Sequence, residues 1–106
     1  MELDIFKKIN EGKCQVVHCK REKYDVYIGR PSKWGNPFSH MPNTIAKYKV
    51  RTRNEAIEAF EKWITEGAGQ HLLKDLSELK GLTLGCWCKP QRCHGEILKK
   101  LVDNLK

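Results

Sequence analysis

Three of the five cysteines and one of the four histidines lie within nine residues near the carboxyl end of the chain, at Cys86, Cys88, Cys93 and His94. These side chains carry the donors that surround zinc in tetrahedral sites, although Cys-x-Cys-x4-Cys-His is not a standard zinc spacing. The stretch also suits nucleophilic catalysis, because a Cys93 thiolate would be stabilised at a helix amino terminus beside Arg92 and His94. Alternatively, small cysteines only fill a tight strand-to-helix junction. The residues leave these interpretations open, with Cys93 and His94 as the candidate catalytic residues.

A second stretch with residue types suited to ligand binding is GRPSKWGNPF, residues 29–38. Its cationic side chains, together with the N–H groups at the start of a helix, suit a phosphate or carboxylate, and Trp34 offers a flat surface for a base. With the cysteine-rich stretch, residues 86–95, it supplies the candidate ligand-binding residues Gly29, Arg30, Lys33, Trp34, Asn36 and Arg92. The competing interpretation is that the glycines serve turns and the aromatic residues fix the loop to the core.

Both stretches follow predicted strands. Residues 24–30 and 82–88 have strand patterns, and helical patterns lie between them. A strand, a helical crossover and a second strand predict a right-handed parallel connection. Parallel strands carry the loops that follow them to the same edge, where open α/β sheets bind ligands. We therefore expect residues 29–38 and 86–95 to meet, whereas antiparallel strands would separate them.

Hydrophobic periodicity places the other elements around these strands. It predicts helices at residues 2–11, 53–66, 71–79 and from 91 or 92 to 105, and a further strand at residues 14–20. That strand pairs most simply with residues 24–30 as a hairpin, and two neighbouring parallel strands with a different connection are the alternative. Residues 29–49 show no periodicity and are expected to form a long loop. The sequence predicts one α/β domain over residues 1–106, with a small three-stranded, at least partly parallel sheet flanked by helices, a Rossmann-like fragment.

The helix at residues 53–66 has the clearest start and stop signals. Thr52 and Glu55 match a capping box, in which the Thr52 hydroxyl accepts a hydrogen bond from the N–H of Glu55 and the Glu55 side chain reaches back. Gly67 is placed to end the helix. We therefore expect these bounds to be the most accurate.

The net charge of +7 is concentrated in one part of the sequence. Residues 13–53 contain ten Lys and Arg against two acidic residues, a net of +8, so the rest of the chain sums to −1. Such a concentration attracts anions, which indicates a nucleotide, a nucleic acid or an acidic protein as the partner. The same charge could equally serve solubility alone.

Several features bear on the compartment. No apolar run approaches the length of a membrane span, and the first twelve residues carry acids where a secretory signal would need a basic start. An odd number of cysteines does not fit a closed disulfide framework. We therefore expect a cytoplasmic protein with no membrane association and no structural disulfide.

Two motifs in this order, IGRPSKWGNPF at residues 28–38 and LTLGCWCKPQRCHGEIL at residues 82–98, resemble the domain-of-unknown-function family 4326, whose hallmarks are an Asn-Pro-Phe and a Cys-Trp-Cys element. The resemblance implies a short protein of the kind found in bacteria, archaea and their viruses, and it brings no established activity. The matching positions are Gly29, Arg30, Gly35, Asn36, Pro37, Phe38, Cys86, Trp87, Cys88, Cys93 and His94. Residues 39–50 look longer and more basic than the resemblance implies.

Three functions follow from these observations. The first is a pocket for a nucleotide or other phosphorylated anionic ligand between residues 29–38 and 86–95, with enzymatic action by Cys93 and His94 left open. The second is a non-enzymatic nucleic-acid-binding module with structural zinc at Cys86, Cys88, Cys93 and His94. The third is a viral or host interaction protein that binds an acidic protein partner.

Overall fold

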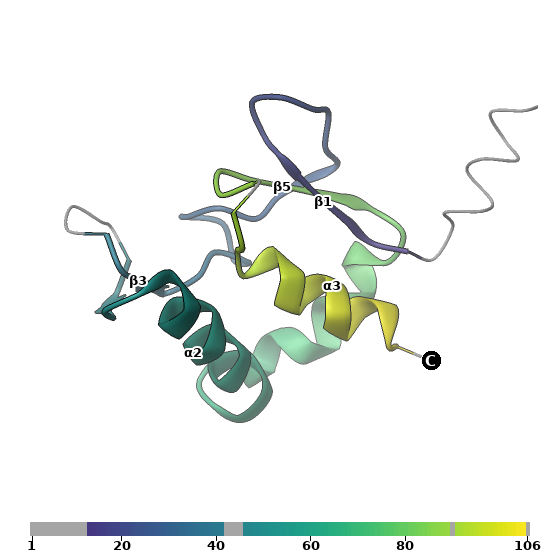
Figure 1. Cartoon of the computed structure of the whole chain (residues 1–106). Helices are drawn as coiled ribbons and strands as arrows, with labels where there is room; N and C mark the ends of the chain where they lie inside the picture. The colour runs from purple at the N-terminus through teal and green to yellow at the C-terminus, as the bar shows by residue number, and fades with distance from the viewer. Residues whose placement is uncertain (1–12, 42–45, 90, 106) are drawn as a thin grey trace, which may run out of the picture.

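The centre of the fold is a three-stranded parallel sheet (Figure 1). The computed structural model describes residues 13–41, 46–89 and 91–105, so the predicted helix at residues 2–11 lies outside the described residues. The strands are β1 (Gln15–His18), β2 (Val26–Tyr27) and β5 (Thr83–Cys86). Both β1 and β2 pair in parallel with β5, which confirms the predicted α/β class and the parallel connection between the second and third strands.

The predicted hairpin between the first two strands is wrong. The strand order is β1-β5-β2, so β5 lies between them. The physical reason is burial: Leu84 and Cys86 of β5 are almost fully buried, whereas the residues of β1 and β2 are only partly buried or exposed. A buried strand needs neighbours on both sides to satisfy its N–H and C=O groups. The last strand in the sequence therefore takes the central position.

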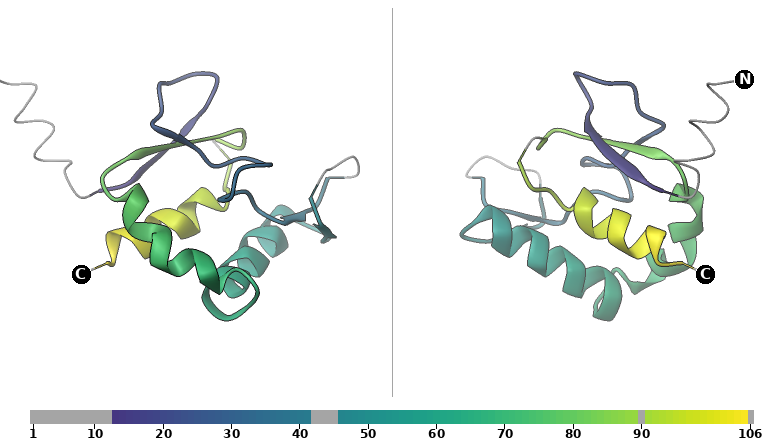
Figure 2. Two further views of the ribbon diagram at one scale, coloured as in Figure 1. Left: turned by 180° about the vertical axis from the view of Figure 1, so that it is seen from behind. Right: turned by 45° about the vertical axis from the view of Figure 1, so that its right-hand side comes forward.

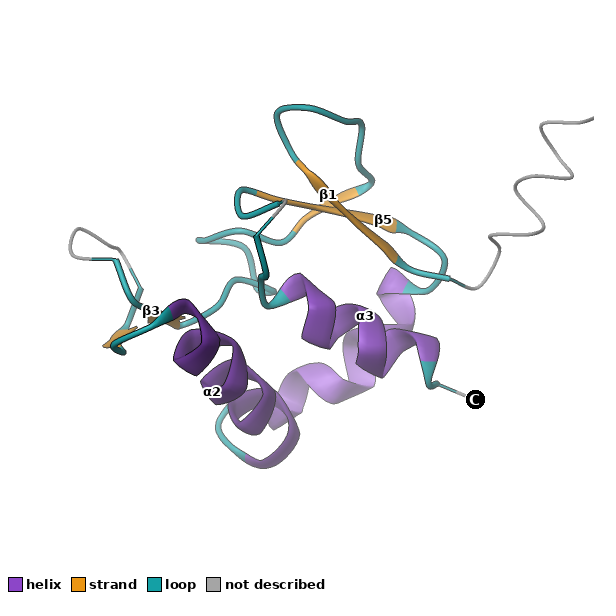
Figure 3. Cartoon of the chain, in the orientation of Figure 1, coloured by secondary structure: helices purple, strands orange, loops and turns teal. Residues whose placement is uncertain are grey.

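Three helices described by the structure lie on the same side of this sheet (Figures 1–3). They are α2 (Arg53–Glu66), the 3-10 helix η1 (Gln70–Leu79) and α3 (Gly95–Asp103). Their apolar faces and the sheet enclose a core whose fully buried members include Ile28, Phe60, Ile64, Leu84 and Leu98. None of the described helices is long and apolar enough to cross a membrane.

Helix α2 has the predicted bounds. The N–H of Glu55 donates to the Thr52 hydroxyl at 3.1 Å, and the N–H of Gly67 closes the last turn by donating to the Trp63 carbonyl. The Glu55 side chain also reaches back as predicted: its carboxylate accepts from the N–H of Arg51 at 2.8 Å, one residue before the expected donor, and hydrogen bonding to Arg51, and then to the Thr52 backbone, lowers its pKa. The Arg51 guanidinium also binds this carboxylate, which favours the earlier position.

The other two helices differ from prediction at their starts. η1 has 3-10 geometry and begins at Gln70, although its buried leucines follow the predicted stripe. α3 begins at Gly95, later than the predicted residue 91 or 92, and ends at Asp103. The side chains just before it are held by other contacts: the His94 ring binds the carbonyls of two distant residues, and the Cys93 sulfur accepts locally from the N–H of Gly95.

The long segment predicted as a loop at residues 29–49 contains two short strands. β3 (Phe38–Ser39) and β4 (Tyr48–Lys49) pair in parallel as a separate two-stranded sheet. The Phe38 and Tyr48 rings stack with centroids 5.1 Å apart. Strands of two residues are too short for a periodic signal, which explains why the sequence pattern does not reveal them.

Candidate functional site

The loops that follow β2 and β5 meet at the carboxyl edge of the sheet. His94 joins them, because its Nε2 lies 2.9 Å from the carbonyl oxygen of Ile28 and 2.9 Å from that of Trp34. A carbonyl oxygen can only accept, so Nε2 carries the ring proton and Nδ1 is the unprotonated nitrogen. Burial lowers the pKa of His94, and the two carbonyls oppose that shift. His94 is therefore a neutral imidazole that ties the two loops together.

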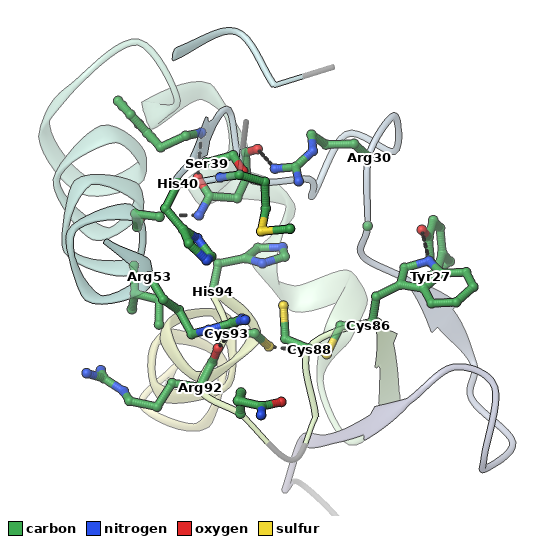
Figure 4. A pocket seen from close by; sticks show the side chains of 18 residues that line it. Tyr27, Arg30, Ser39, His40, Arg53, Cys86, Cys88, Arg92, Cys93 and His94 are labelled. Atoms are coloured by element: carbon green, nitrogen blue, oxygen red, sulfur yellow. Dashed lines mark hydrogen bonds between the residues drawn. The ribbon is translucent and has the colours of Figure 1, made fainter. Parts of the chain in front are cut away.

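A concave pocket of about 540 Å³ opens beside this junction (Figure 4). Both loops, the first turns of α2 and residues 39–41 line it. The predicted ligand-binding residues Gly29, Arg30, Asn36 and Arg92 are among the lining residues, together with the candidate catalytic residues Cys93 and His94. The structure thus brings together most of the residues that the sequence singled out.

Lys33 and Trp34 lie elsewhere. The Lys33 ammonium forms ion pairs with Asp75 at 3.3 Å and Glu78 at 2.9 Å on η1, and these contacts raise the pKa of Lys33. Trp34 is only 3% exposed and packs in the core. Neither residue is available to a ligand in the pocket, and the face of Trp34 cannot stack on a base there.

Among the described Lys, Arg, Asp and Glu residues, the pocket is lined by basic side chains alone. They are Arg30, Arg53 and Arg92, with His40 beside them, and no Asp or Glu is among the described lining residues. Arg53 was not identified from the sequence, but its position offers a signal. A positive charge in the first turn of a helix is unfavourable because of the helix dipole. The arginine at the start of α2 therefore does not stabilise the helix by its charge, which could have indicated a role in binding.

Hydrogen bonds hold the arginines at the rim of the pocket. Nη1 of Arg30 donates to the Asn36 carbonyl at 2.6 Å, and Nη1 of Arg53 donates to the Arg92 carbonyl at 3.2 Å. Arg92 donates from Nη1 to Asn54 at 2.9 Å and from Nε to the Glu96 carboxylate at 3.2 Å. A guanidinium has five N–H donors, so each group keeps some for a ligand.

Asn36 has a structural role in the lining. Its Nδ2 donates to the Ala56 carbonyl at 3.1 Å, and its Oδ1 accepts from the N–H of Phe38 at 2.9 Å. Both ends of this buried amide are therefore engaged within the protein. Asn36 fixes the first loop against α2, and through its own carbonyl it helps to hold Arg30.

An exposed aromatic pair forms another part of the lining. Trp87 is 55% exposed, and its Nε1–H donates to the Tyr27 hydroxyl at 2.7 Å. Gly29 leaves room for this pair, because a Cβ at this position would lie 2.2 Å from the Tyr27 hydroxyl oxygen. Trp87 was singled out from the sequence only as a motif position. Alternation along the strand places it on the face opposite Cys86 and Cys88, a signal that could have indicated exposure.

The three clustered cysteines also line the pocket (Figure 4). The sulfurs of Cys86 and Cys93 are 3.2 Å apart, and both residues are 1% exposed, whereas Cys88 is half-buried. Hydrogen bonds from Cys88 and then Cys93 lower the pKa of Cys86. Hydrogen bonding to Cys86 and Cys88, followed by burial, raises the pKa of Cys93. Thiolate character thus falls on Cys86, not on the predicted nucleophile Cys93.

The predicted zinc ligands gain no support from this arrangement. Among residues 13–41, 46–89 and 91–105, no group of three or more His, Cys, Asp and Glu side chains could hold a metal ion. The Nε2 of His94 is already committed to the two carbonyl oxygens. Cys86, Cys88 and Cys93 are better described as a cluster of free thiols.

Comparison with known proteins places the chain in a family. It is 35% identical over 94 residues to an uncharacterised 12.4 kDa protein from the nrdA-td intergenic region of Enterobacteria phage T4, covering 87% of this chain and 80% of the relative. It is 33% identical over 119 residues to an uncharacterised protein of Acanthamoeba polyphaga mimivirus, covering 95% and 81%. No solved structure matches it. The family described as Domain of unknown function (DUF4326) matches residues 14–104, and the chain belongs to this family.

Proposed function

We propose that the pocket binds a nucleotide or a related phosphorylated anion. The observation that carries the proposal is its charge: three arginines line it, and no carboxylate is among its described lining residues. Guanidinium groups match phosphate oxygens with paired, charge-assisted hydrogen bonds. A cavity of about 540 Å³ is also within the usual range for small-molecule sites.

The arginines come from three segments that the fold brings together. Arg30 follows β2, Arg53 begins α2 and Arg92 precedes α3. Their hydrogen bonds go mainly to carbonyl and amide oxygens, and within the described part of the chain only Arg92 also binds a carboxylate, that of Glu96. Most of their positive charge is therefore left for a ligand, and two or three charge-assisted contacts give the site a strong preference for phosphate over a neutral group.

The aromatic pair favours a nucleotide over a simple phosphate. The exposed ring of Trp87 is held at its edge by the hydrogen bond to Tyr27 and offers a surface on which a base can stack. Base stacking contributes about 1–3 kcal/mol, which is enough to distinguish a nucleotide from inorganic phosphate.

The proposal is limited to binding. The proton-bearing nitrogen of His94 is held by two carbonyls, and the pKa of Cys93 is raised by its neighbours. These contacts support a structural role for His94 and give Cys93 no activation as a nucleophile.

Calorimetric titration with nucleoside mono-, di- and triphosphates, nucleosides and inorganic phosphate tests this function. Replacing Arg30 or Arg92 by alanine should weaken the binding of a phosphorylated ligand by about tenfold or more, because a charge-assisted contact contributes about 1.5–3 kcal/mol. Trp87→Ala should weaken nucleotide binding and leave the affinity for inorganic phosphate unchanged.

Arg51→Ala is the matched control. It removes the same charge from a side chain that is 88% exposed and lies outside the pocket lining, so ligand affinity should change less than twofold. The proposal fails if no phosphorylated compound binds, or if Arg51→Ala weakens binding as much as Arg30→Ala does. Tight, salt-dependent binding of a single-stranded oligonucleotide with equal sensitivity to both variants would replace it with the nucleic-acid-binding module.

A further inference from the structure

The three thiols in the pocket have no role in anion binding, and their arrangement indicates a second property. Cys86 lies at the end of β5, Cys93 lies two residues before α3, and Cys88 lies in the loop between them. The sulfurs of Cys86 and Cys93 are 3.2 Å apart and buried. Figure 4 shows the three side chains grouped beside His94 at one end of the pocket.

We propose that these residues form a thiol–disulfide exchange site, in which Cys86 and Cys93 are the redox pair and Cys88 is the thiol that meets a low-molecular-weight disulfide such as oxidised glutathione. The proposal is independent of nucleotide binding, because it requires only that the pocket admit the disulfide.

The redox pair is defined by proximity. Two sulfurs in van der Waals contact need to approach by only about 1 Å to reach the bond length of a disulfide, about 2.05 Å. Cys86 is the last residue of its strand, and Cys93 lies outside α3, so the approach distorts no helix. In the reduced state the Cys93 sulfur accepts the N–H of Gly95 at 3.2 Å, which holds the thiol in place facing its partner.

The entry thiol is defined by access. Cys86 and Cys93 are each 1% exposed and cannot reach a disulfide in solution, whereas Cys88 is half-buried and lines the pocket. Cys88 is near enough to both partners of the pair to shift their pKa values, and Figure 4 shows the three side chains grouped together, so an oxidised Cys88 is within their reach. The arginines that line the pocket attract the carboxylates of glutathione.

The exchange balances in three steps. The Cys88 thiolate attacks oxidised glutathione, which forms a mixed disulfide and releases one glutathione thiolate. Cys86 then attacks the Cys88 sulfur of the mixed disulfide and displaces the second glutathione. Once Cys86 is part of the Cys86–Cys88 disulfide it no longer carries the charge that helps to raise the pKa of Cys93. Cys93 then loses its proton and attacks the Cys86 sulfur, which forms the Cys86–Cys93 disulfide and releases Cys88 as the thiolate. Two protein thiols are oxidised, one glutathione disulfide is reduced to two thiols, and the two protons from the protein thiols end on glutathione.

Peptide mapping of the full chain tests the pairing. The protein is equilibrated in buffers of increasing oxidised to reduced glutathione ratio without nucleotide, its free thiols are alkylated, and it is digested with trypsin. Cleavage after Arg92 but not at the Lys89-Pro90 bond separates peptides 81–92 and 93–99. The expected product joins these peptides by a reducible bond, with Cys88 alkylated in peptide 81–92 and two of the five free thiols lost. A disulfide confined to peptide 81–92, or five alkylatable thiols throughout, would overturn the proposal.

Cys88→Ser and Cys19→Ser form a matched pair of variants, since both remove a half-buried thiol and only Cys88 lines the pocket. Cys88→Ser should slow oxidation by glutathione disulfide about tenfold or more and leave the linked peptides as the end product. Cys19→Ser should oxidise at the wild-type rate. Equal rates for the two variants would remove Cys88 from the mechanism. Loss of nucleotide binding alone leaves these results unchanged, so the two proposals fail separately.

Discussion

Acid should destabilise this fold through His94. Burial lowers the pKa of this imidazole in the folded chain below its ordinary value of 6.5, which the unfolded chain retains. Below pH 6.5 the unfolded chain therefore binds a proton that the folded chain does not. The free energy of unfolding is at its full value above this pH and falls as the pH decreases.

The magnitude follows from one proton. With the folded imidazole neutral throughout, the contribution approaches about 1.4 kcal/mol per pH unit, and it amounts to about 1 kcal/mol between pH 6.5 and about pH 5.5. The structure explains why neutrality persists. The ring is buried, Phe60 packs edge-on against it at 4.9 Å between centroids, and no carboxylate contacts it among the described residues.

Urea denaturation at about pH 7.5, 6.5 and 5.5 measures this effect. His94→Gln keeps an amide donor for the carbonyls of Ile28 and Trp34 but cannot titrate. The free energy of unfolding of this variant should therefore not show the decrease of about 1 kcal/mol between pH 6.5 and about pH 5.5. His71→Gln is the control, because His71 is exposed on η1 and should leave the wild-type slope unchanged. The same acid slope in wild type and His94→Gln would refute the assignment of the neutral imidazole.

Two further substitutions test how the site is built. Gly95→Ala should lower the free energy of unfolding by about 1–3 kcal/mol in urea denaturation, because its Cβ would lie 2.9 Å from both Ile28 Cδ1 and Val16 Cγ1. A gain in stability would show that helix propensity outweighs this close approach. Asn36→Ala should cost about 2–4 kcal/mol by leaving the N–H of Phe38 unpaired and removing the buried hydrogen bond to the Ala56 carbonyl, whereas Asn54→Ala on the surface should cost less than about 1 kcal/mol. Equal losses for the two asparagine variants would argue against the buried amide as the anchor of the loop.

The parallel sheet could be predicted because it depends on a rule about connections. A strand, a helical crossover and a strand leave few topologies, and the pairing of β2 with β5 follows. The position of β1 depends instead on which strand is buried most deeply. A local pattern of two strands and a charged turn favours a hairpin, and it contains no information about β5, which is about sixty residues further along the chain. The hairpin prediction is wrong because β5, which is distant in the sequence, pairs with both strands and separates them.

Contacts between residues distant in the sequence also limit how much of the site could be predicted. Arg30 and Arg92 line the pocket because each lies about three residues from an element, β2 or α3, whose existence could be predicted. Lys33 is a basic residue of the same loop as Arg30, but it forms ion pairs with Asp75 and Glu78 on η1. Ion pairs between residues so far apart in the chain cannot be predicted from the local sequence. Strand alternation could have indicated that Trp87 is exposed, whereas only the folded chain shows that Trp34 is buried.

The two family motifs therefore divide into residues that build the pocket and residues that face it. Asn36 and His94 direct their polar atoms to the protein itself, so their loss would disturb the junction of the two loops before any ligand contact is considered. Arg30, Trp87 and Cys88 line the pocket and keep polar, aromatic or thiol groups available. Loss of function in Asn36 or His94 variants consequently does not identify a ligand contact. Substitutions of the second group can do so, provided that the free energy of unfolding stays constant.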